Sequence, residues 1–258
     1  MRSVREPDRV HMFKTTRGLV LREVRYKEAD RMLTVLTEDE GKISVKARGA
    51  LRNGSKTGAA TQLFAFSEFT ILSRNGLRSV SEALTIEEFK GLRGSIASLA
   101  LASYFAECAE AMSDEDQPNP NLLQLTLNCL YALSNELYEP ERIKAAFELR
   151  LMCLAGYEPE LSGCTVCGEA EPAEPWFLPR SGMISCAACR GAERDGVLPL
   201  CAGSLGAMRF ICRCQPRKLL AFKIDADAQR RLYAACEAYL LAQTERRFQT
   251  LDYWKKVK

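Results

Sequence analysis

Met32-Leu33-Thr34-Val35-Leu36-Thr37 is rich in residues that favour β-strands, and Lys42-Ile43-Ser44-Val45-Lys46-Ala47 alternates apolar with polar residues. Between the two segments, Glu38-Asp39-Glu40-Gly41 is typical of a turn. The stretch therefore predicts an antiparallel hairpin whose alternate side chains enter a core.

Strand-like segments continue on both sides of this hairpin. Residues 14–26 precede it, and residues 64–72 and 77–84 follow it across Asn75-Gly76, a favoured two-residue hairpin turn. Five short strands over residues 12–85 predict a closed antiparallel barrel of the OB type. Such barrels commonly bind single-stranded nucleic acid in a basic groove with aromatic platforms.

The charge of the chain is uneven. Residues 1–85 contain sixteen Lys and Arg against ten Asp and Glu, a net charge of +6, whereas residues 86–258 contain twenty against twenty-three, a net charge of −3. A basic barrel indicates a polyanionic partner, although a solvated basic surface would look the same. The candidate DNA-binding residues lie on the first hairpin, on the glycine-rich loop after residue 47 and around the last turn: Arg22, Arg25, Lys27, Lys46, Arg48, Arg52, Lys56, Arg74 and Arg78. Tyr26 is a candidate ring for base stacking.

From residue 86 onward the hydrophobic period becomes helical. The pattern predicts helices over about 92–112, 121–137, 140–156, 204–214 and 225–247, so that residues 86–258 form a helical domain. Residues 1–11 are polar and are expected to be flexible. With no apolar stretch long enough to span a membrane and no signal sequence, the chain is expected to be cytoplasmic.

Four cysteines interrupt the helical pattern as two Cys-x-x-Cys pairs. Cys164 and Cys167 form the first pair, and Cys186 and Cys189 form the second, eighteen residues further on. This spacing is typical of a zinc site with four thiolate ligands. Four thiolates complete a tetrahedron and leave no position for water or substrate, so we expect one structural Zn²⁺ per chain, in a module at about 160–195. Two disulfides, or unrelated core cysteines, are the alternative.

These elements, in this order, resemble the RecO family of bacterial DNA-repair proteins over nearly the whole chain. The resemblance rests on an ordered set of motifs: Thr16-Arg17-Gly18-Leu19-Val20-Leu21, Lys27-Glu28-Ala29-Asp30, Leu36-Thr37-Glu38-Asp39-Glu40-Gly41-Lys42, Lys46-Ala47-Arg48-Gly49, Phe147-Glu148-Leu149-Arg150 and Gly156-Tyr157-Glu158-Pro159. The chain departs from the family at Ser181-Gly182, where two glycines often precede the third cysteine.

The resemblance implies a recombination mediator that is not an enzyme. Such a protein would bind single- and double-stranded DNA, anneal complementary strands and, with RecR, help load RecA onto DNA coated with the single-strand-binding protein SSB. It would hold the acidic, apolar C-terminal tail of SSB on its helical domain, for which Arg142, Lys144 and Arg150 are the candidate cations. RecA would be an indirect partner, and whether a RecF-type partner takes part stays open. Two other functions remain alternatives: a scaffold that binds only proteins, and a nucleic-acid repair enzyme.

Overall fold

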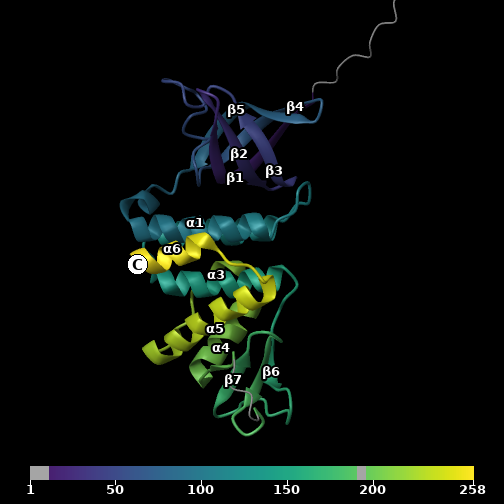
Figure 1. Cartoon of the computed structure of the whole chain (residues 1–258), viewed down its shortest axis with the longest axis vertical. Helices are drawn as coiled ribbons and strands as arrows, with labels where there is room; N and C mark the ends of the chain where they lie inside the picture. The colour runs from purple at the N-terminus through teal and green to yellow at the C-terminus, as the bar shows by residue number, and fades with distance from the viewer. Residues whose placement is uncertain (1–11, 191–195) are drawn as a thin grey trace, which may run out of the picture. The chain divides into compact units, whose positions relative to one another are not determined.

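The structure of the chain is a computed structural model that describes residues 12–190 and 196–258 (Figure 1). The described chain forms two compact units. The barrel unit comprises the residues up to Phe89 together with Ala109–Leu123, and the helical unit comprises Lys90–Cys108 and Gln124–Lys258. The N-terminal residues 1–11, which the sequence predicts to be flexible, lie outside the described residues.

Five strands close into the predicted barrel. They are β1 (Met12–Tyr26), β2 (Asp30–Thr37), β3 (Gly41–Ala47), β4 (Phe66–Arg74) and β5 (Leu77–Glu87). Their order around the barrel is β1-β2-β3-β5-β4; β3 and β5 pair in parallel, and the other neighbours are antiparallel. The alternation seen in the sequence places Ile43, Val45 and Ala47 of β3 inside, where they join a fully buried apolar core. The prediction of a closed five-stranded barrel is confirmed, and its strands are antiparallel except where β5 closes the barrel against β3.

Glycine is required at the turn between β2 and β3. Gly41 has a φ of 66°, and a Cβ atom there would lie 2.0 Å from the carbonyl oxygen of Gln117. No other residue combines this left-handed backbone with so close an approach, which explains the Glu40-Gly41 sequence at the turn. At the turn between β4 and β5, Asn75 and Gly76 both have positive φ, as their pairing in the sequence predicts.

Six α-helices follow the barrel in the described chain: α1 (Ile96–Ala111), α2 (Pro120–Ser134), α3 (Pro140–Leu154), α4 (Ala202–Arg213), α5 (Ala226–Thr244) and α6 (Gln249–Val257). Two short 3₁₀ segments, η1 (Lys90–Gly94) and η2 (Pro216–Lys218), accompany them. In the helical unit α3 lies against α5, as Figure 1 shows, and both contact α4. Apolar faces at helical spacing thus form one core, as the periodicity predicts.

The helix predicted over residues 225–247 is α5, which ends three residues early, at Thr244, and the sequence pattern did not indicate α6 beyond it. Glu245 adopts the left-handed conformation, with a φ of 49°, and ends α5. The chain then places Phe248 in the core, where its ring packs edge-on against Tyr104 with the centroids 5.7 Å apart. Tertiary packing of Phe248 ends this helix, since neither Gly nor Pro marks the break in the sequence.

Candidate functional site

The four predicted metal ligands come together at one end of a small sheet in the helical unit. The sheet consists of β6 (Glu160–Cys164), β7 (Pro175–Leu178), β8 (Met183–Cys186) and β9 (Leu198–Pro199), in the order β6-β8-β7-β9. β6 and β8 run in parallel, so each delivers its last residue, Cys164 or Cys186, to the same edge. The turns that follow these two strands supply Cys167 and Cys189.

The geometry of the four sulfurs suits a tetrahedral ion. All four lie within 4.8 Å of one another, and those of Cys167 and Cys186 are 3.9 Å apart. A zinc ion with Zn–S bonds of about 2.3 Å would set sulfurs about 3.8 Å apart, so the cage needs only a small contraction. The cluster can therefore hold one metal ion through four thiolates. No other group of three or more such ligands occurs in the part of the chain that the structure describes.

Backbone groups prepare Cys164 to act as a thiolate. Hydrogen bonds from the backbone N–H groups of Cys167, Cys186 and Val166 lower the pKa of Cys164 to about 6. The hydrogen bonds that the Cys189 thiol shares with Cys186 and with the other two cysteines raise the pKa of Cys189 to about 12. A bound divalent cation supplies the positive charge that allows all four to deprotonate together, so this donor set is suited to a metal.

Arg209 of α4 fastens this sheet to the helices, a role that the sequence alone did not indicate. Its guanidinium donates to the carbonyl oxygens of Leu161 and Ala170, at 2.8 and 2.7 Å, and pairs with Glu171 at 2.5 Å. These partners lie 38 to 48 residues away in sequence, which is why local patterns do not identify them. The metal module is thereby joined to the core of the helical unit.

In the barrel unit, Asp30 organises the glycine-rich loop that carries the predicted basic residues. Its carboxylate accepts a hydrogen bond from the backbone N–H of Gly49 at 2.8 Å and pairs with Lys46 at 2.9 Å. These two contacts lower the pKa of Asp30. The backbone N–H of Leu51 donates to the carbonyl oxygen of Ala29 at 2.9 Å. The loop is thus fixed beside the turn between β1 and β2.

Arg31 holds the far side of the same loop. It donates to the carbonyl oxygen of Gly58 at 2.8 Å and to the hydroxyl of Thr61 at 3.0 Å, and its own guanidinium also pairs with Glu23. Only 12% of its side chain is exposed, so Arg31 serves to shape the loop and not to meet a ligand.

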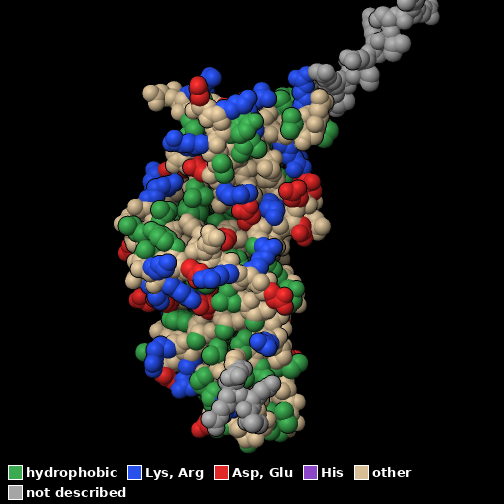
Figure 2. All heavy atoms as spheres, viewed as in Figure 1, with side chains coloured by type: hydrophobic (Ala, Val, Ile, Leu, Met, Phe, Trp, Pro, Cys, Tyr) green, Lys and Arg blue, Asp and Glu red, His purple; other side chains and the backbone are tan. Residues whose placement is uncertain are grey.

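The predicted DNA-binding residues divide into free and internally paired cations. Three have acidic partners: Arg22 pairs with Glu110, Lys46 pairs with Asp30, and Arg78 pairs with Glu40 and Asp116. The other six are exposed and have no ion pair within the described residues: Arg25, Lys27, Arg48, Arg52, Lys56 and Arg74. Figure 2 shows Lys and Arg side chains spread over the barrel, with few acidic side chains among them.

The structure does not gather all nine cations into one group. Six of the cations, which we call the loop cluster, lie at the end of β1, on the turn between β1 and β2, at the end of β3 and on the loop fixed by Asp30: Arg25, Lys27, Lys46, Arg48, Arg52 and Lys56. Because β5 runs parallel to β3 with Ser79 opposite Lys46, the turn between β4 and β5 points toward the start of β3. Arg74 and Arg78 therefore belong to the opposite end of β3, where Arg78 meets Glu40.

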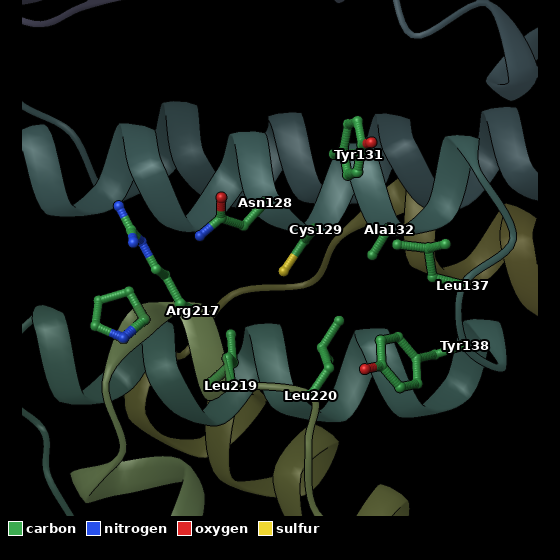
Figure 3. A pocket seen from close by; sticks show the side chains of 10 residues that line it. Asn128, Cys129, Tyr131, Ala132, Leu137, Tyr138, Arg217, Leu219 and Leu220 are labelled. Carbon is green, nitrogen blue, oxygen red and sulfur yellow. The ribbon is translucent and has the colours of Figure 1, made fainter.

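The helical unit contains a cleft of about 300 Å³ between α2 and the segment around η2. We call it the α2–η2 cleft. Cys129, Ala132, Leu219 and Leu220 give it an apolar lining, and Arg217 reaches into it at the end opposite Leu137 and Tyr138 (Figure 3).

Arg142 stands at the Tyr138 side of this cleft. Its guanidinium carbon lies 5.0 Å from the ring centroid of Tyr138 and 4.4 Å from that of Phe222. The Nε atom of Arg142 is buried without a hydrogen-bond partner in the described chain. The sequence identified Arg142 as a candidate, but it gave no sign of Arg217, which comes from a segment 75 residues further on.

Lys144 and Arg150, the other two candidate cations for the SSB tail, are engaged inside the helical unit, which corrects the sequence-based expectation. Lys144 is only 5% exposed and lies 2.8 Å from both Glu148 and Glu237. Arg150 donates to the carbonyl oxygens of Ile211, Cys212 and Cys214 at the end of α4. Neither side chain is available to an incoming carboxylate.

Comparisons with known proteins place the chain in a family. The family described as Recombination protein O, N terminal, matches residues 12–89, and Recombination protein O, C terminal, matches residues 93–252. DNA repair protein RecO of Acetivibrio thermocellus is 31% identical over 240 residues, which cover 93% of this chain and 95% of that relative. DNA repair protein RecO of Symbiobacterium thermophilum is 30% identical over 239 residues, which cover 92% and 94% of the two chains.

The barrel, the helical unit and these matches define the class: a DNA-repair protein. Within that class, the chain belongs to the RecO family. None of the helices described in residues 12–190 and 196–258 has the length and apolar character needed to cross a membrane.

Proposed function

We propose that this protein is a recombination mediator. It binds single- and double-stranded DNA, anneals complementary strands and, together with RecR, helps RecA to load onto SSB-coated single strands in the cytoplasm, on the nucleoid. RecA is an indirect partner, and a RecF-type protein is a further candidate partner. The observation that carries the proposal is the loop cluster, in which five exposed cations that form no ion pair with the described residues accompany Lys46 around the loop that Asp30 fixes in the barrel unit.

The physics of annealing fits such a surface. Two DNA strands approach each other only when part of their phosphate charge is neutralised, and cations on a protein do this while releasing condensed counterions. The step makes and breaks no covalent bond, so a mediator requires charge and geometry and not a nucleophile or an acid. We also propose that Zn²⁺ occupies the four-cysteine centre with a structural role, because its four thiolates would leave no coordination position for a substrate.

We propose the α2–η2 cleft as the place where the acidic, apolar tail of SSB binds. Its apolar lining suits a bulky side chain of the tail, and Arg142 and Arg217 offer guanidinium groups to carboxylates near it. This placement keeps Arg142 from the candidates that the sequence indicates and replaces Lys144 and Arg150, which are engaged inside the helical unit, with Arg217.

The direct test of the function is annealing of two complementary labelled oligonucleotides without ATP, first bare and then coated with SSB. We expect the protein to accelerate both reactions. Acceleration of neither would support a protein-only scaffold, and cleavage or ligation of the strands would support a repair enzyme.

Reversing the charge of Arg217 tests the cleft. Arg217→Glu is expected to weaken binding of a fluorescent peptide with the SSB tail sequence by about 10- to 100-fold, because a charge-assisted hydrogen bond contributes about 1.5–3 kcal/mol. Fluorescence anisotropy measures this affinity. Arg213→Glu is the matched control, since Arg213 is exposed at the end of α4 and does not line the cleft. If both variants lost the same peptide affinity, the overall charge of the protein and not the α2–η2 cleft would determine binding of the tail.

A further inference from the structure

Tyr26 is the last residue of β1 and has an exposed ring beside the loop cluster. Its side chain belongs to the outer face of the barrel, because Val24 and Tyr26 are both exposed and lie opposite Met32 and Asp30 of β2. The exposed fraction of Tyr26 is 43%, and that of Val24 is 52%. An aromatic ring and an apolar neighbour thus meet solvent on the outer face of β1.

The position of the Tyr26 ring is fixed by Lys46. The Lys46 ammonium lies 4.6 Å from the ring centroid, and Asp30 holds the same ammonium at 2.9 Å. Asp30 is in turn bound to the loop through the backbone N–H of Gly49. Ring, cation and carboxylate form one connected arrangement that links β1, β2 and β3, so that the ring is oriented before any ligand arrives.

Cations that suit phosphates surround this ring. Lys27 follows it directly, with its ammonium 5.7 Å from the ring centroid, and Arg48 lies next to the anchored Gly49. Single-stranded DNA needs such a pair of features, because its backbone is held by positive charge and its bases stack on aromatic rings. Duplex DNA can use only the cations, since its bases are already stacked on one another.

We propose that Tyr26 forms a stacking subsite for an unpaired nucleobase and that it gives the barrel its preference for single-stranded over double-stranded DNA. This inference rests on the proposed DNA-binding function and adds a specificity-determining residue to it. Phe13 provides the contrast: it is 62% exposed at the opposite end of β1, and no cation lies over its ring within the described residues.

Anisotropy titrations with a labelled single strand and with the matching duplex test the proposal on the full-length protein. Tyr26→Leu should weaken single-strand binding by about 5- to 150-fold, the equivalent of losing one stacked base, and should change duplex affinity less than about twofold. Tyr26→Phe should behave like the unchanged protein, because it keeps the ring. Phe13→Leu, the matched control, should change neither affinity.

A second readout does not depend on the folding of any variant. A single strand that contains 2-aminopurine should lose fluorescence when it binds the unchanged protein, because stacking on the ring quenches this base. Equal losses of single-strand and duplex affinity in Tyr26→Leu, or unchanged 2-aminopurine fluorescence on saturated protein, would overturn the stacking subsite while leaving DNA binding intact. Failure of the unchanged protein to bind either DNA would overturn the proposed function as well.

Discussion

Replacing Cys164 or Cys189 with serine is expected to remove the metal and unfold the β6–β9 sheet. The four sulfurs bring both Cys-x-x-Cys turns to one point, and the sheet itself has strands of only two to five residues. Metal binding and folding are coupled in such small modules, so the loss of one ligand is expected to destabilise the fold of the module. Metal analysis should fall from about one equivalent of zinc to near zero.

Trp176 reports on this module directly, because it lies on β7 with the Arg190 guanidinium 3.8 Å from its ring centroid. In a background with Trp254 replaced by Phe, the emission of Trp176 should shift to longer wavelength in Cys164→Ser and in Cys189→Ser. Cys201→Ser is the matched control: Cys201 is not a ligand, and serine is a favoured residue at its position before α4. A variant that loses DNA binding but keeps its metal and fold would show that the centre is more than structural.

Local patterns were enough to predict the barrel and the metal centre. Alternation within β3 and the Asn75-Gly76 turn depend on neighbouring residues, and so does the spacing of each pair of cysteines. In each case, the residues that specify the element are close in sequence, so the element can be predicted without knowing how the rest of the chain folds.

Features formed by distant partners could not be predicted in this way. The sequence around Lys144 is that of a surface cation, but in the structure Lys144 is bonded to Glu237, which lies 93 residues away in sequence. Arg150 meets carbonyl groups 61 to 64 residues further on, and the α2–η2 cleft joins segments that are separated by the whole metal module. Charge alone identified the basic residues of the barrel, but pairing with Glu110, Asp30 and Glu40 decided which of them remain free.

Removing Lys46, Arg48, Arg52 and Lys56 together, as a quadruple alanine variant, is expected to lower DNA affinity near 0.1 M salt by about 500-fold for duplex DNA and about 100-fold for single strands. Each phosphate contact contributes about 0.9 to the slope of log K against log salt for duplex DNA and about 0.7 for single strands. Because Lys46 is already paired with Asp30, the structure predicts that the slope falls by the equivalent of about three contacts and not four. Annealing of bare and SSB-coated strands should slow in parallel.

The triple variant Arg48→Ala, Arg52→Ala and Lys56→Ala separates charge from loop structure, since it leaves Lys46 and its contacts with Asp30 and Tyr26 in place. It should lose nearly as much of the salt dependence as the quadruple variant. The control removes three exposed cations of the helical unit, Arg180, Arg213 and Lys223, and so matches the change in net charge. If this control anneals as slowly as the triple variant, the overall charge drives binding and the loop cluster is not the DNA surface. If both variants anneal as fast as the unchanged protein, the mediator function stands, and its DNA contacts lie elsewhere, with Arg25, Lys27 and Arg74 the next cations to replace.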